Sequence, residues 1–564
     1  MAVRIDDPGE SASPRRRLPR RDLLKAAGIS ASGATILATG LVGPWAGEAS
    51  AAEGSGETPA AGGGRAVAPP RIDFTMPSLA FESPSLQSLL GPVYEAALTN
   101  VVGINSAYAE PSTYDLANLV TYPPGNFVLA GGGYPLPQRW TRDASVNTWN
   151  AVSMLAPVVG RNTLWSVIDS QTGGGLIVQQ DDEWWDQIVW VVSAWNHFLV
   201  TGDRTFLAGA YDTAVNTMAA RVSGNFNAPL GLFEGPGFMN DGISAYPEPP
   251  YEPGVNSSFV LDYQYASVMM CLSTNCIYYG AYQAMAGMAA VLGQASHAAT
   301  YQQAAVALRT AINTHFWQPD AGTYGYLIHG AADPDAGQLD THQEAGGLAL
   351  AVLLGVASAS QTRLLLDRTQ WEPHGVVNVW PNFAWYDDGT DDGKWGRQAS
   401  LWPMVHSMFG HAAAAGGRSD LFARAVTDLA EMVSASQVHF YELYNPVTGV
   451  PDGGWQPGAG SSEITQWTAQ PDQTWSATGY LRMIYRALFG LNFTTQGLEF
   501  APCLPEGWGT VSLSGLPYRD AILDITLTGA GTGIKSMLVD GRPHSPLIPD
   551  TISGAHTIEI TLAS

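Results

Sequence analysis

At 564 residues the chain is longer than one hydrophobic core usually serves, so its length predicts a large body with a smaller module attached. Asp and Glu number 50 against 26 Lys and Arg, which gives a net charge of -24. A charge of this sign repels phosphate backbones and anionic lipids, and so argues against nucleic-acid and membrane partners for the mature chain. The 18 Trp and 22 Tyr exceed what core packing requires, and flat rings at this density suit the faces of sugars.

Residues 1–51 have the pattern of a secretory leader: basic residues come first, then an apolar run from Ala26 to Trp45, then the small residues Ala49-Ser50-Ala51. The segment Arg20-Arg21-Asp22-Leu23-Leu24-Lys25 resembles the twin-arginine export signal. A membrane helix is the alternative, but the glycines in the run weaken it. We expect a twin-arginine signal peptide that is cleaved after Ala51, with the export machinery as a partner and an extracytoplasmic or secreted product. Residues 52–71, rich in Gly, Ala, Ser and Pro, are predicted to be a disordered linker.

From residue 72 to residue 490, apolar residues recur at helical spacing in blocks that loops rich in Gly and Pro separate. The blocks predict twelve helices, at residues 84–101, 144–159, 162–170, 185–200, 204–222, 265–293, 297–317, 341–354, 359–369, 399–415, 418–435 and 473–489. Several are joined in pairs by short turns, which fits six helical hairpins wound into a ring. The sequence therefore predicts a mainly α protein, an (α/α)6 toroid over residues 72–490. Its long loops, at about 222–262, 371–398 and 437–472, would gather at one end.

Residues 491–564 change to short runs of alternating apolar and polar residues, which predict a small C-terminal β-domain. Cysteine does not stabilise this fold through a disulfide framework, because the chain has three, Cys271, Cys276 and Cys503. Cys271 and Cys276 fall within one predicted helix and are expected to be small buried hydrophobic residues.

Two acidic residues in aromatic loops are the candidates for acid–base chemistry. Asp241 lies in the Gly- and aromatic-rich segment 235–247, and Glu442 lies among aromatic residues in the segment 439–449. Hydrolysis of a glycosidic bond without a metal requires a protonated acid and a second carboxylate on opposite sides of the bond. Each residue has a structural alternative. Asp241 could cap a turn, since Asn-Asp-Gly is strong turn chemistry, and Glu442 could be a buried carboxylate paired with an arginine.

The residues around Glu442 carry a family resemblance. Glu442-Leu443-Tyr444-Asn445-Pro446 with Thr448-Gly449, followed by Gln473-Thr474-Trp475-Ser476-Ala477, resembles the closing signature of glycoside hydrolase family 63 and the mannosylglycerate-hydrolase-like enzymes. The resemblance implies that Glu442 is the general base of an inverting α-glycosidase. The second segment opens the last predicted helix and could place Trp475 beside Glu442 in the centre of the ring, where we expect it to bind substrate. Asp241 resembles the general acid of the wider six-hairpin group, although the Arg that follows the acid's loop in that group is missing here. Its rivals are Glu234, Glu248 and Asp262.

Two further segments resemble the substrate-holding elements of that group, namely Trp140-Thr141-Arg142-Asp143 and Trp395-Gly396-Arg397 with Leu401-Trp402-Pro403. The resemblance implies that Asp143 binds sugar hydroxyls, that Arg142 and Arg397 orient carboxylates, and that Trp395 and Trp402 stack on the sugar. The alternatives are that Asp143 caps a helix starting at Ala144 and that the tryptophans pack in cores. Capping is also the simpler explanation for the cluster Asp182, Trp184, Trp185 and Asp186, whereas Gln343 and Glu344 could face the cavity.

Together these features predict an exported, exo-acting, inverting α-glycosidase that hydrolyses a neutral-sugar glycoside, an α-glucoside or an α-mannoside. No cofactor is expected; calcium is the alternative, because the acidic run at residues 387–392 resembles a calcium loop without matching EF-hand spacing. Three other functions compete. A disaccharide phosphorylase would need basic residues where Glu442 stands, a polysaccharide lyase would bind uronates that a charge of -24 repels, and a glycan-binding protein would use its aromatic residues without catalysis.

Overall fold

The computed structural model describes residues 74, 76–109, 125–133, 138–171, 175–179, 183–247, 259–383, 395–457 and 464–563. The chain divides into two units, Met1–Ala46 and Gly47–Ser564, and every described residue belongs to the second. The predicted leader and linker lie outside the described residues, as do Asp182, Glu248 and the acidic run at 387–392.

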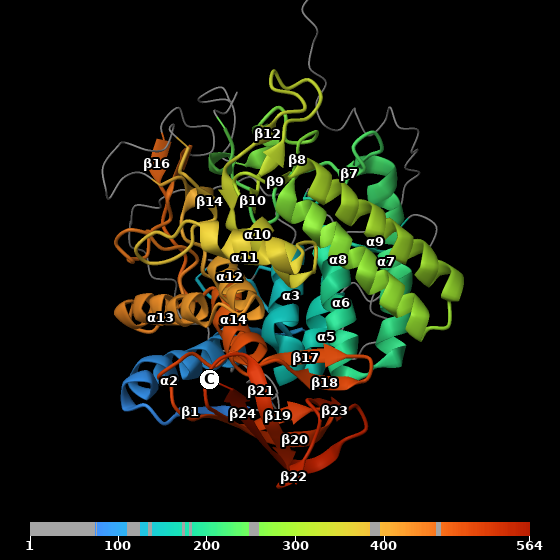
Figure 1. The fold of residues 1–564 in the computed structure, drawn as a ribbon. Helices are drawn as coiled ribbons and strands as arrows, with labels where there is room; N and C mark the ends of the chain where they lie inside the picture. Colours follow the sequence, from blue (N-terminus) through green and yellow to red (C-terminus); the bar gives the residue numbers. More distant parts are fainter. Residues whose placement is uncertain are drawn as a thin grey trace, which may run out of the picture. The chain divides into compact units, whose positions relative to one another are not determined.

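Each of the twelve predicted helical segments overlaps a helix in the structure (Figure 1). The helices are α2 (Pro84–Thr99), α3 (Thr141–Asn147), α4 (Ser153–Leu155), α5 (Pro157–Trp165), α6 (Gln187–Thr201), α7 (Arg204–Asn225), α8 (Leu272–Val291), α9 (Ala295–His315), α10 (Ala345–Leu353), α11 (Ala359–Arg368), α12 (Pro403–Ala415), α13 (Ser419–Ala435) and α14 (Thr474–Arg482). Three π-helical turns extend them, η1 (Asn100–Ile104), η3 (Thr148–Val152) and η7 (Met483–Leu488).

Six of these helices close into a ring. Helix α3 packs against α6, α6 against α8, α8 against α10, α10 against α12, α12 against α14, and α14 returns to α3. Outside this ring, α5 and α7 pack on α6, α9 on α8, α13 on α12, and α2 on α14. An inner ring covered by outer partners is the (α/α)6 toroid, so the predicted fold class is confirmed.

Several predicted helix boundaries are wrong. Helix α10 begins at Ala345 rather than at residue 341, because Gln343–Glu344 forms strand β13, and α12 begins at Pro403 rather than at residue 399. Helix α8 begins at Leu272 rather than at residue 265, because Met270–Cys271 forms strand β8, which pairs with β11 (Leu327–Ile328). Cys271 therefore precedes the helix, although it is buried as expected. Helix α5 starts at Pro157 and ends at Trp165, since residues 168–170 form strand β4 (Ile168–Ser170). Helix α3 starts at Thr141, three residues before the predicted position.

The segments that connect the helices of the ring contain short strands and turns. They are β2 (Ser106–Ala109), β3 (Gly125–Val128), β5 (Leu176–Val178), β6 (Phe226–Asn227), β7 (Leu232–Phe233), β9 (Trp317–Gln318), β10 (Thr323–Tyr324), β12 (Leu339–Asp340), β13 (Gln343–Glu344), β14 (Val379–Trp380), β15 (Trp455–Pro457) and β16 (Ile464–Gln466), with 3-10 turns η4 (Ile243–Ala245), η5 (Val260–Asp262) and η6 (Arg397–Ala399). Strands β7, β8, β12, β14 and β16 lie at the same end of the ring (Figure 1).

The C-terminal strands form two sheets. The larger has the order β1-β19-β20-β24-β21-β22, and the smaller has the order β17-β18-β23. Their bounds are β1 (Ser78–Phe81), β17 (Leu491–Thr494), β18 (Gly497–Phe500), β19 (Val511–Tyr518), β20 (Asp520–Thr528), β21 (Gly533–Val539), β22 (Arg542–Pro543), β23 (Leu547–Pro549) and β24 (Ser553–Ala563). Strand β1, within the range predicted for the toroid, pairs with β19 from Ser78↔Ser514 to Phe81↔Val511. The β-domain is therefore completed by the N-terminal end of the described chain.

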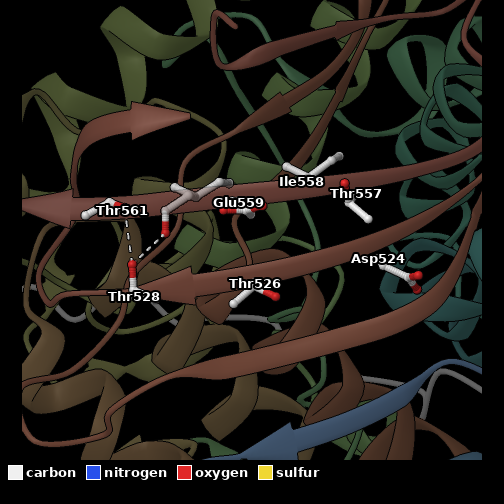
Figure 2. A pocket seen from close by; sticks show the side chains of 8 residues that line it. Asp524, Thr526, Thr528, Thr557, Ile558, Glu559 and Thr561 are labelled. Atoms are coloured by element: carbon white, nitrogen blue, oxygen red, sulfur yellow. Dashed lines mark hydrogen bonds between the residues drawn. The ribbon is translucent and has the colours of Figure 1, made fainter. Parts of the chain in front are cut away.

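The larger sheet buries one face and presents the other to solvent. Along β20, exposed or half-buried residues alternate with the buried Ala521, Leu523, Ile525 and Leu527, as expected for a sheet with one covered face. On the opposite face, a shallow hollow of about 260 Å³ is lined by Thr526, Thr528, Thr557, Thr561, Asp524 and Glu559 (Figure 2). This hollow contains no aromatic ring and shares no residue with the candidate site described below.

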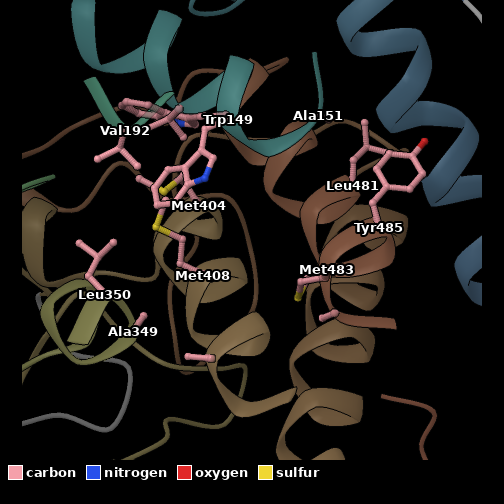
Figure 3. Close-up of a cluster of buried hydrophobic side chains, with 14 of the residues drawn as sticks. Trp149, Ala151, Val192, Ala349, Leu350, Met404, Met408, Leu481, Met483 and Tyr485 are labelled. Atoms are coloured by element: carbon pink, nitrogen blue, oxygen red, sulfur yellow. The ribbon is translucent and has the colours of Figure 1, made fainter. Parts of the chain in front are cut away.

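The interior of the ring is filled with apolar side chains from its inner elements. Figure 3 shows Trp149 of η3, Val192 of α6, Leu350 of α10, Met404 of α12 and Leu481 of α14 in this cluster. The same buried cluster includes residues of the β-domain, such as Leu513, Ile525 and Ile558. Toroid and β-domain therefore share one hydrophobic core. Among the described residues, the helices are too short or too polar to cross a membrane.

Candidate active site

One arginine contacts three carboxylates. Arg142, in the first turn of α3, donates from Nη2 to Asp241 Oδ2 at 2.8 Å and to Glu183 Oε2 at 3.3 Å. Its Nε lies 3.3 Å from Asp186 Oδ2. The Arg142 side chain is only 7% exposed, so these ion pairs are shielded from bulk water and from salt.

A second arginine holds Glu442. Arg397 in η6 donates from Nη2 to Glu442 Oε1 at 2.7 Å and from Nη1 to the Gly453 carbonyl at 3.0 Å. The Glu442 side chain is 5% exposed, and its Oε2 is buried without a hydrogen-bond partner in the described part of the chain. The carboxylate therefore keeps one oxygen available for a ligand or a water.

The residue next to Arg397 links the two arginine centres. Gln398 Nε2 donates to Asp241 Oδ1 at 2.8 Å, so consecutive residues of η6 contact Glu442 and Asp241. Close to both centres, the Trp475 ring lies 5.8 Å from the Arg142 guanidinium and 5.6 Å from the Trp402 ring. We call Asp143, Glu183, Asp186, Asp241 and Glu442, with Arg142 and Arg397, the carboxylate cluster.

The two segments of the family resemblance lie side by side in the structure. The Glu442 amide donates to the Gln470 carbonyl at 2.8 Å, and the Gln473 amide donates to the Phe440 carbonyl at 2.8 Å. These two backbone hydrogen bonds fix Glu442 relative to the start of α14, where Trp475 is located.

The loop that carries Asp241 is shaped by a strained residue. Met239 is fully buried and has φ 72, a left-handed conformation that costs a non-glycine residue about 1 kcal/mol or more. The Asp241 carbonyl accepts a hydrogen bond from the Val260 amide at 2.7 Å. Its carboxylate is used by Arg142 and Gln398 rather than by a turn amide. The turn-capping alternative for this side chain therefore does not describe its contacts.

Burial changes the protonation of this cluster. It raises the pKa of Asp143 to about 8, against the opposing effect of the Arg142 charge, and the neighbouring Asp186, Glu442 and Asp241 charges add to the increase. Burial also raises the pKa of Glu183. At neutral pH, Asp143 is therefore a neutral acid that can donate a hydrogen bond.

Of the structural alternatives for the other residues, helix capping is wrong, whereas the arginine pair and core packing are present. Asp143 lies inside the first turn of α3, and Asp186 precedes α6 without a side-chain capping bond, so neither caps its helix in the way suggested. The pairing of Glu442 with an arginine, in contrast, is present. Trp402 and Trp475 are 2% and 5% exposed, so core packing accounts for most of their surface.

The remaining predicted residues make contacts elsewhere. The Trp395 carbonyl accepts a hydrogen bond from the Trp455 amide at 2.8 Å, and the Trp395 side chain is half-buried. Glu234 accepts from Asn227 at 2.8 Å, and Asp262 is exposed. Gln343 is bonded to the backbone of Gln370. Among the residues that the structure describes, no three His, Cys, Asp or Glu side chains are grouped to hold a metal ion.

Sequence reasoning missed two members of the site, Gln398 and Glu183. Gln398 follows Arg397 directly, and Glu183 stands beside the Trp184-Trp185-Asp186 run, so adjacency was the signal in both cases. Neither residue type indicates its partner, because the partners Asp241 and Arg142 come from distant parts of the chain.

Comparison with known families decides the class of the protein. The model of the mannosylglycerate hydrolase MGH1-like glycoside hydrolase domain matches residues 186–476, just over half of the chain. The chain belongs to this family. As a glycoside hydrolase, it is an enzyme, which sets aside the non-catalytic glycan-binding alternative. The C-terminal domain model of glycosyl hydrolase family 65 matches residues 491–544 and covers the first part of the β-domain.

Three solved structures are similar to this MGH1-like glycoside hydrolase to different degrees. A sialidase has a TM-score of 0.57 at 13% identity, covering 83% of this chain and 40% of its own. The GH78 family rhamnosidase of Bacillus sp. GL1 has a TM-score of 0.47 at 13% identity, covering 87% of this chain and 44% of its own. The GH63 mannosylglycerate hydrolase from Thermus thermophilus, in complex with Tris, has a TM-score of 0.46 at 15% identity, covering 70% and 99%. The chain spans less than half the length of the first two. No curated protein sequence matches it.

Proposed function

We propose that this glycoside hydrolase is an exo-acting, inverting α-glycosidase in which Glu442 activates water and Asp241 protonates the glycosidic oxygen. The observation that carries the proposal is the pairing of both carboxylates with consecutive residues, Arg397 and Gln398. A base must be ionised and must keep an oxygen for its water. Arg397 pairs with Oε1 of Glu442, and the unpartnered Oε2 leaves room for the water.

Asp241 has a more demanding task, because a general acid must carry a proton. In the structure both of its oxygens accept hydrogen bonds, from Arg142 and from Gln398. Proton delivery therefore requires that one of these contacts is released when the substrate enters. We expect the contact between Arg142 and Asp241 to be the one that breaks. Arg142 also contacts Glu183 and Asp186, and it keeps these partners when Asp241 turns away.

The charge of the cluster supports an uncharged substrate. Five carboxyl groups face two guanidinium groups, and both guanidinium groups already contact carboxylates. A substrate carboxylate would add a further negative charge to a buried site in which carboxyl groups already outnumber guanidinium groups, and a buried charge without full compensation is costly. For this chain we propose a neutral leaving group on an α-glucoside or α-mannoside.

The test is to incubate the protein with α-linked disaccharides and aryl α-glycosides and to follow the released anomer by NMR. Inversion predicts that the β-anomer appears first, and an α-anomer appearing first would contradict it. Addition of inorganic phosphate should not yield a sugar phosphate; if it does, the enzyme is a phosphorylase.

Substitutions test the two roles. Glu442→Gln and Asp241→Asn keep the size of the side chains and should each lower kcat by about 10²- to 10⁴-fold while the sugar still binds. Glu234→Gln is the matched control. It lies on the loop that leads to Asp241 but bonds to Asn227, so it should leave turnover near that of the parent. Full turnover in Glu442→Gln or in Asp241→Asn would remove that residue from the mechanism.

We also propose that the enzyme is exported by the twin-arginine route and acts outside the cytoplasm. The support is the order of basic, apolar and small residues over residues 1–51. Replacing Arg20 and Arg21 together by Lys should retain the enzyme in the cytoplasm, and the exported protein should begin at Ala52 on N-terminal sequencing. Export of the Lys-Lys variant at the parental level would contradict this route.

A further inference from the structure

Asn240, the residue before Asp241, has its polar atoms fully engaged although it is completely buried. Its amide donates to the Gly237 carbonyl at 2.9 Å, and its carbonyl accepts from the Tyr246 hydroxyl at 2.6 Å. The Asn240 Nδ2 donates to the Tyr326 hydroxyl at 3.0 Å and to Glu344 Oε1 at 3.4 Å. The Asn240 Oδ1 accepts from Asn378 Nδ2. Such saturation fixes both the side chain and the backbone of this residue.

The partners of Asn240 are themselves buried and bonded. Glu344 is 1% exposed and accepts from the amide of Ser273 at 3.0 Å and from its hydroxyl, at the start of α8. Asn378 also donates to the Met239 carbonyl at 3.3 Å. The Tyr246 hydroxyl, which donates to Asn240, accepts from the Gly237 amide at 2.9 Å. The network therefore joins the loop of Asp241 to α8, β13 and the segments around residues 326 and 378.

This network lies where the loop stores strain. Met239, with φ 72, stands directly before Asn240, so the local backbone would relax to another conformation without external bonds. The space around Gly237 shows how closely Glu344 and Asn240 pack against the loop. A Cβ there would lie 2.9 Å from Glu344 Oε1 and 2.8 Å from Asn240 Nδ2. The bonds to Asn240 thus select one arrangement of the residues that precede Asp241.

We propose that Asn240, Tyr246 and Tyr326 are positioning residues that fix the direction of the Asp241 carboxyl toward the glycosidic oxygen. Tyr246 and Tyr326 act through Asn240 and do not touch the substrate. This inference rests on the proposed role of Asp241 as the acid. A displacement of about 1 Å at a catalytic group lowers the rate by about 10²-fold, so the network should matter most for substrates whose departure needs a proton.

The test uses two pairs of comparisons. Tyr246→Phe and Tyr326→Phe each remove one hydroxyl from the network, and Tyr324→Phe is the matched control. Tyr324 is equally buried, but its hydroxyl donates to Asn313 Oδ1, away from Asp241. Each variant is assayed with a disaccharide, whose leaving group needs protonation, and with a 2,4-dinitrophenyl glycoside, whose leaving group does not.

Tyr246→Phe and Tyr326→Phe are expected to lower kcat on the disaccharide by about 10- to 100-fold, with little change in KM, and to leave the dinitrophenyl substrate nearly unaffected. Tyr324→Phe should show parental rates on both substrates, with a melting temperature lowered as in the other two variants. Equal losses on both substrates, or no difference from Tyr324→Phe, would overturn the inference. If Asp241→Asn keeps its activity on the disaccharide, the proposed function fails instead, whatever the tyrosine variants do.

Discussion

The Glu442 side chain is almost completely buried in the folded protein, and the Arg397 guanidinium is the group that compensates its charge. Arg397 is held by more than this ion pair, because its guanidinium also lies 5.9 Å from the Trp402 ring and 5.4 Å from the Trp467 ring. The aromatic rings and the carboxylate therefore orient the same cation, which joins packing to electrostatics at the position of the proposed base.

Removing this cation should destabilise the protein. Arg397→Met keeps an unbranched chain between the two rings but leaves Glu442 buried without its charge partner, which costs about 3 to 5 kcal/mol. Unfolding in guanidinium chloride measures the loss. The double variant Arg397→Met with Glu442→Leu removes both charges and should recover a large part of the stability. If the double variant were as unstable as the single one, charge compensation would not be the cause.

The pH dependence of stability should reveal Asp143. Its pKa in the folded protein is raised to about 8, so the folded state retains a proton that the unfolded state releases, and stability falls as pH rises from about 4 to about 8. Asp143→Asn keeps the neutral shape and lacks this proton. The variant should melt near the parent at pH 5 and above it at pH 9. Asp262→Asn, at an exposed position, should show the same difference from the parent at both values.

At the scale of residues, sequence indicates most members of the site but not their contacts. Asp241, Glu442, Arg142 and Arg397 are predictable because their residue types occur in aromatic or motif-like surroundings, and the structure brings them together. The interpretation of Asp186 as a helix cap is wrong, because the local pattern before a helix overlooks its distant partner Arg142. For Gln398 the local signal is limited to its adjacency to Arg397, since an amide becomes informative only when its partner is known.

At the scale of elements, periodicity identifies helices more reliably than their ends. The predicted range 265–293 includes the strand β8, because Met270 and Cys271 are apolar and fit a helical pattern as well as a strand. Similarly, residues 168–170 fall at the end of the predicted helix 162–170 but pair with β5 instead. Strand pairing joins distant residues, so a local pattern cannot exclude it.

One glycine connects the last helical turn to the β-domain. Gly490 has φ 63, and a Cβ there would lie 2.0 Å from the Ala501 carbonyl carbon. Gly490→Ala should therefore lower stability by about 3 kcal/mol or more, through a strained φ and a backbone clash. Gly507→Ala is the control, with φ 80 and nothing within 4 Å, and should cost about 1 kcal/mol. Equal melting temperatures for the two variants would show that the clash is relieved at no cost.

At the scale of the whole molecule, the shared core predicts that the two domains unfold together. Leu513 and Ile525 belong to the same buried cluster as Leu350 and Met404 of the ring. Calorimetry of the chain from residue 72 to 564 should show one transition. A chain that ends at residue 490 exposes the apolar surface that β17 to β24 cover, and should not unfold cooperatively. A cooperative transition in the shortened chain would show that the toroid is an independent folding unit.

The pairing of β1 with β19 also sets the order in which the chain can assemble during synthesis. Ser78 leaves the ribosome early, but its partner Ser514 is made near the end, and α14, which closes the ring against α3, precedes it only slightly. Strand β1 therefore has no partner strand while almost all of the toroid is translated. Because contacts between distant residues slow folding, we expect the larger sheet to be completed only after the last strands emerge.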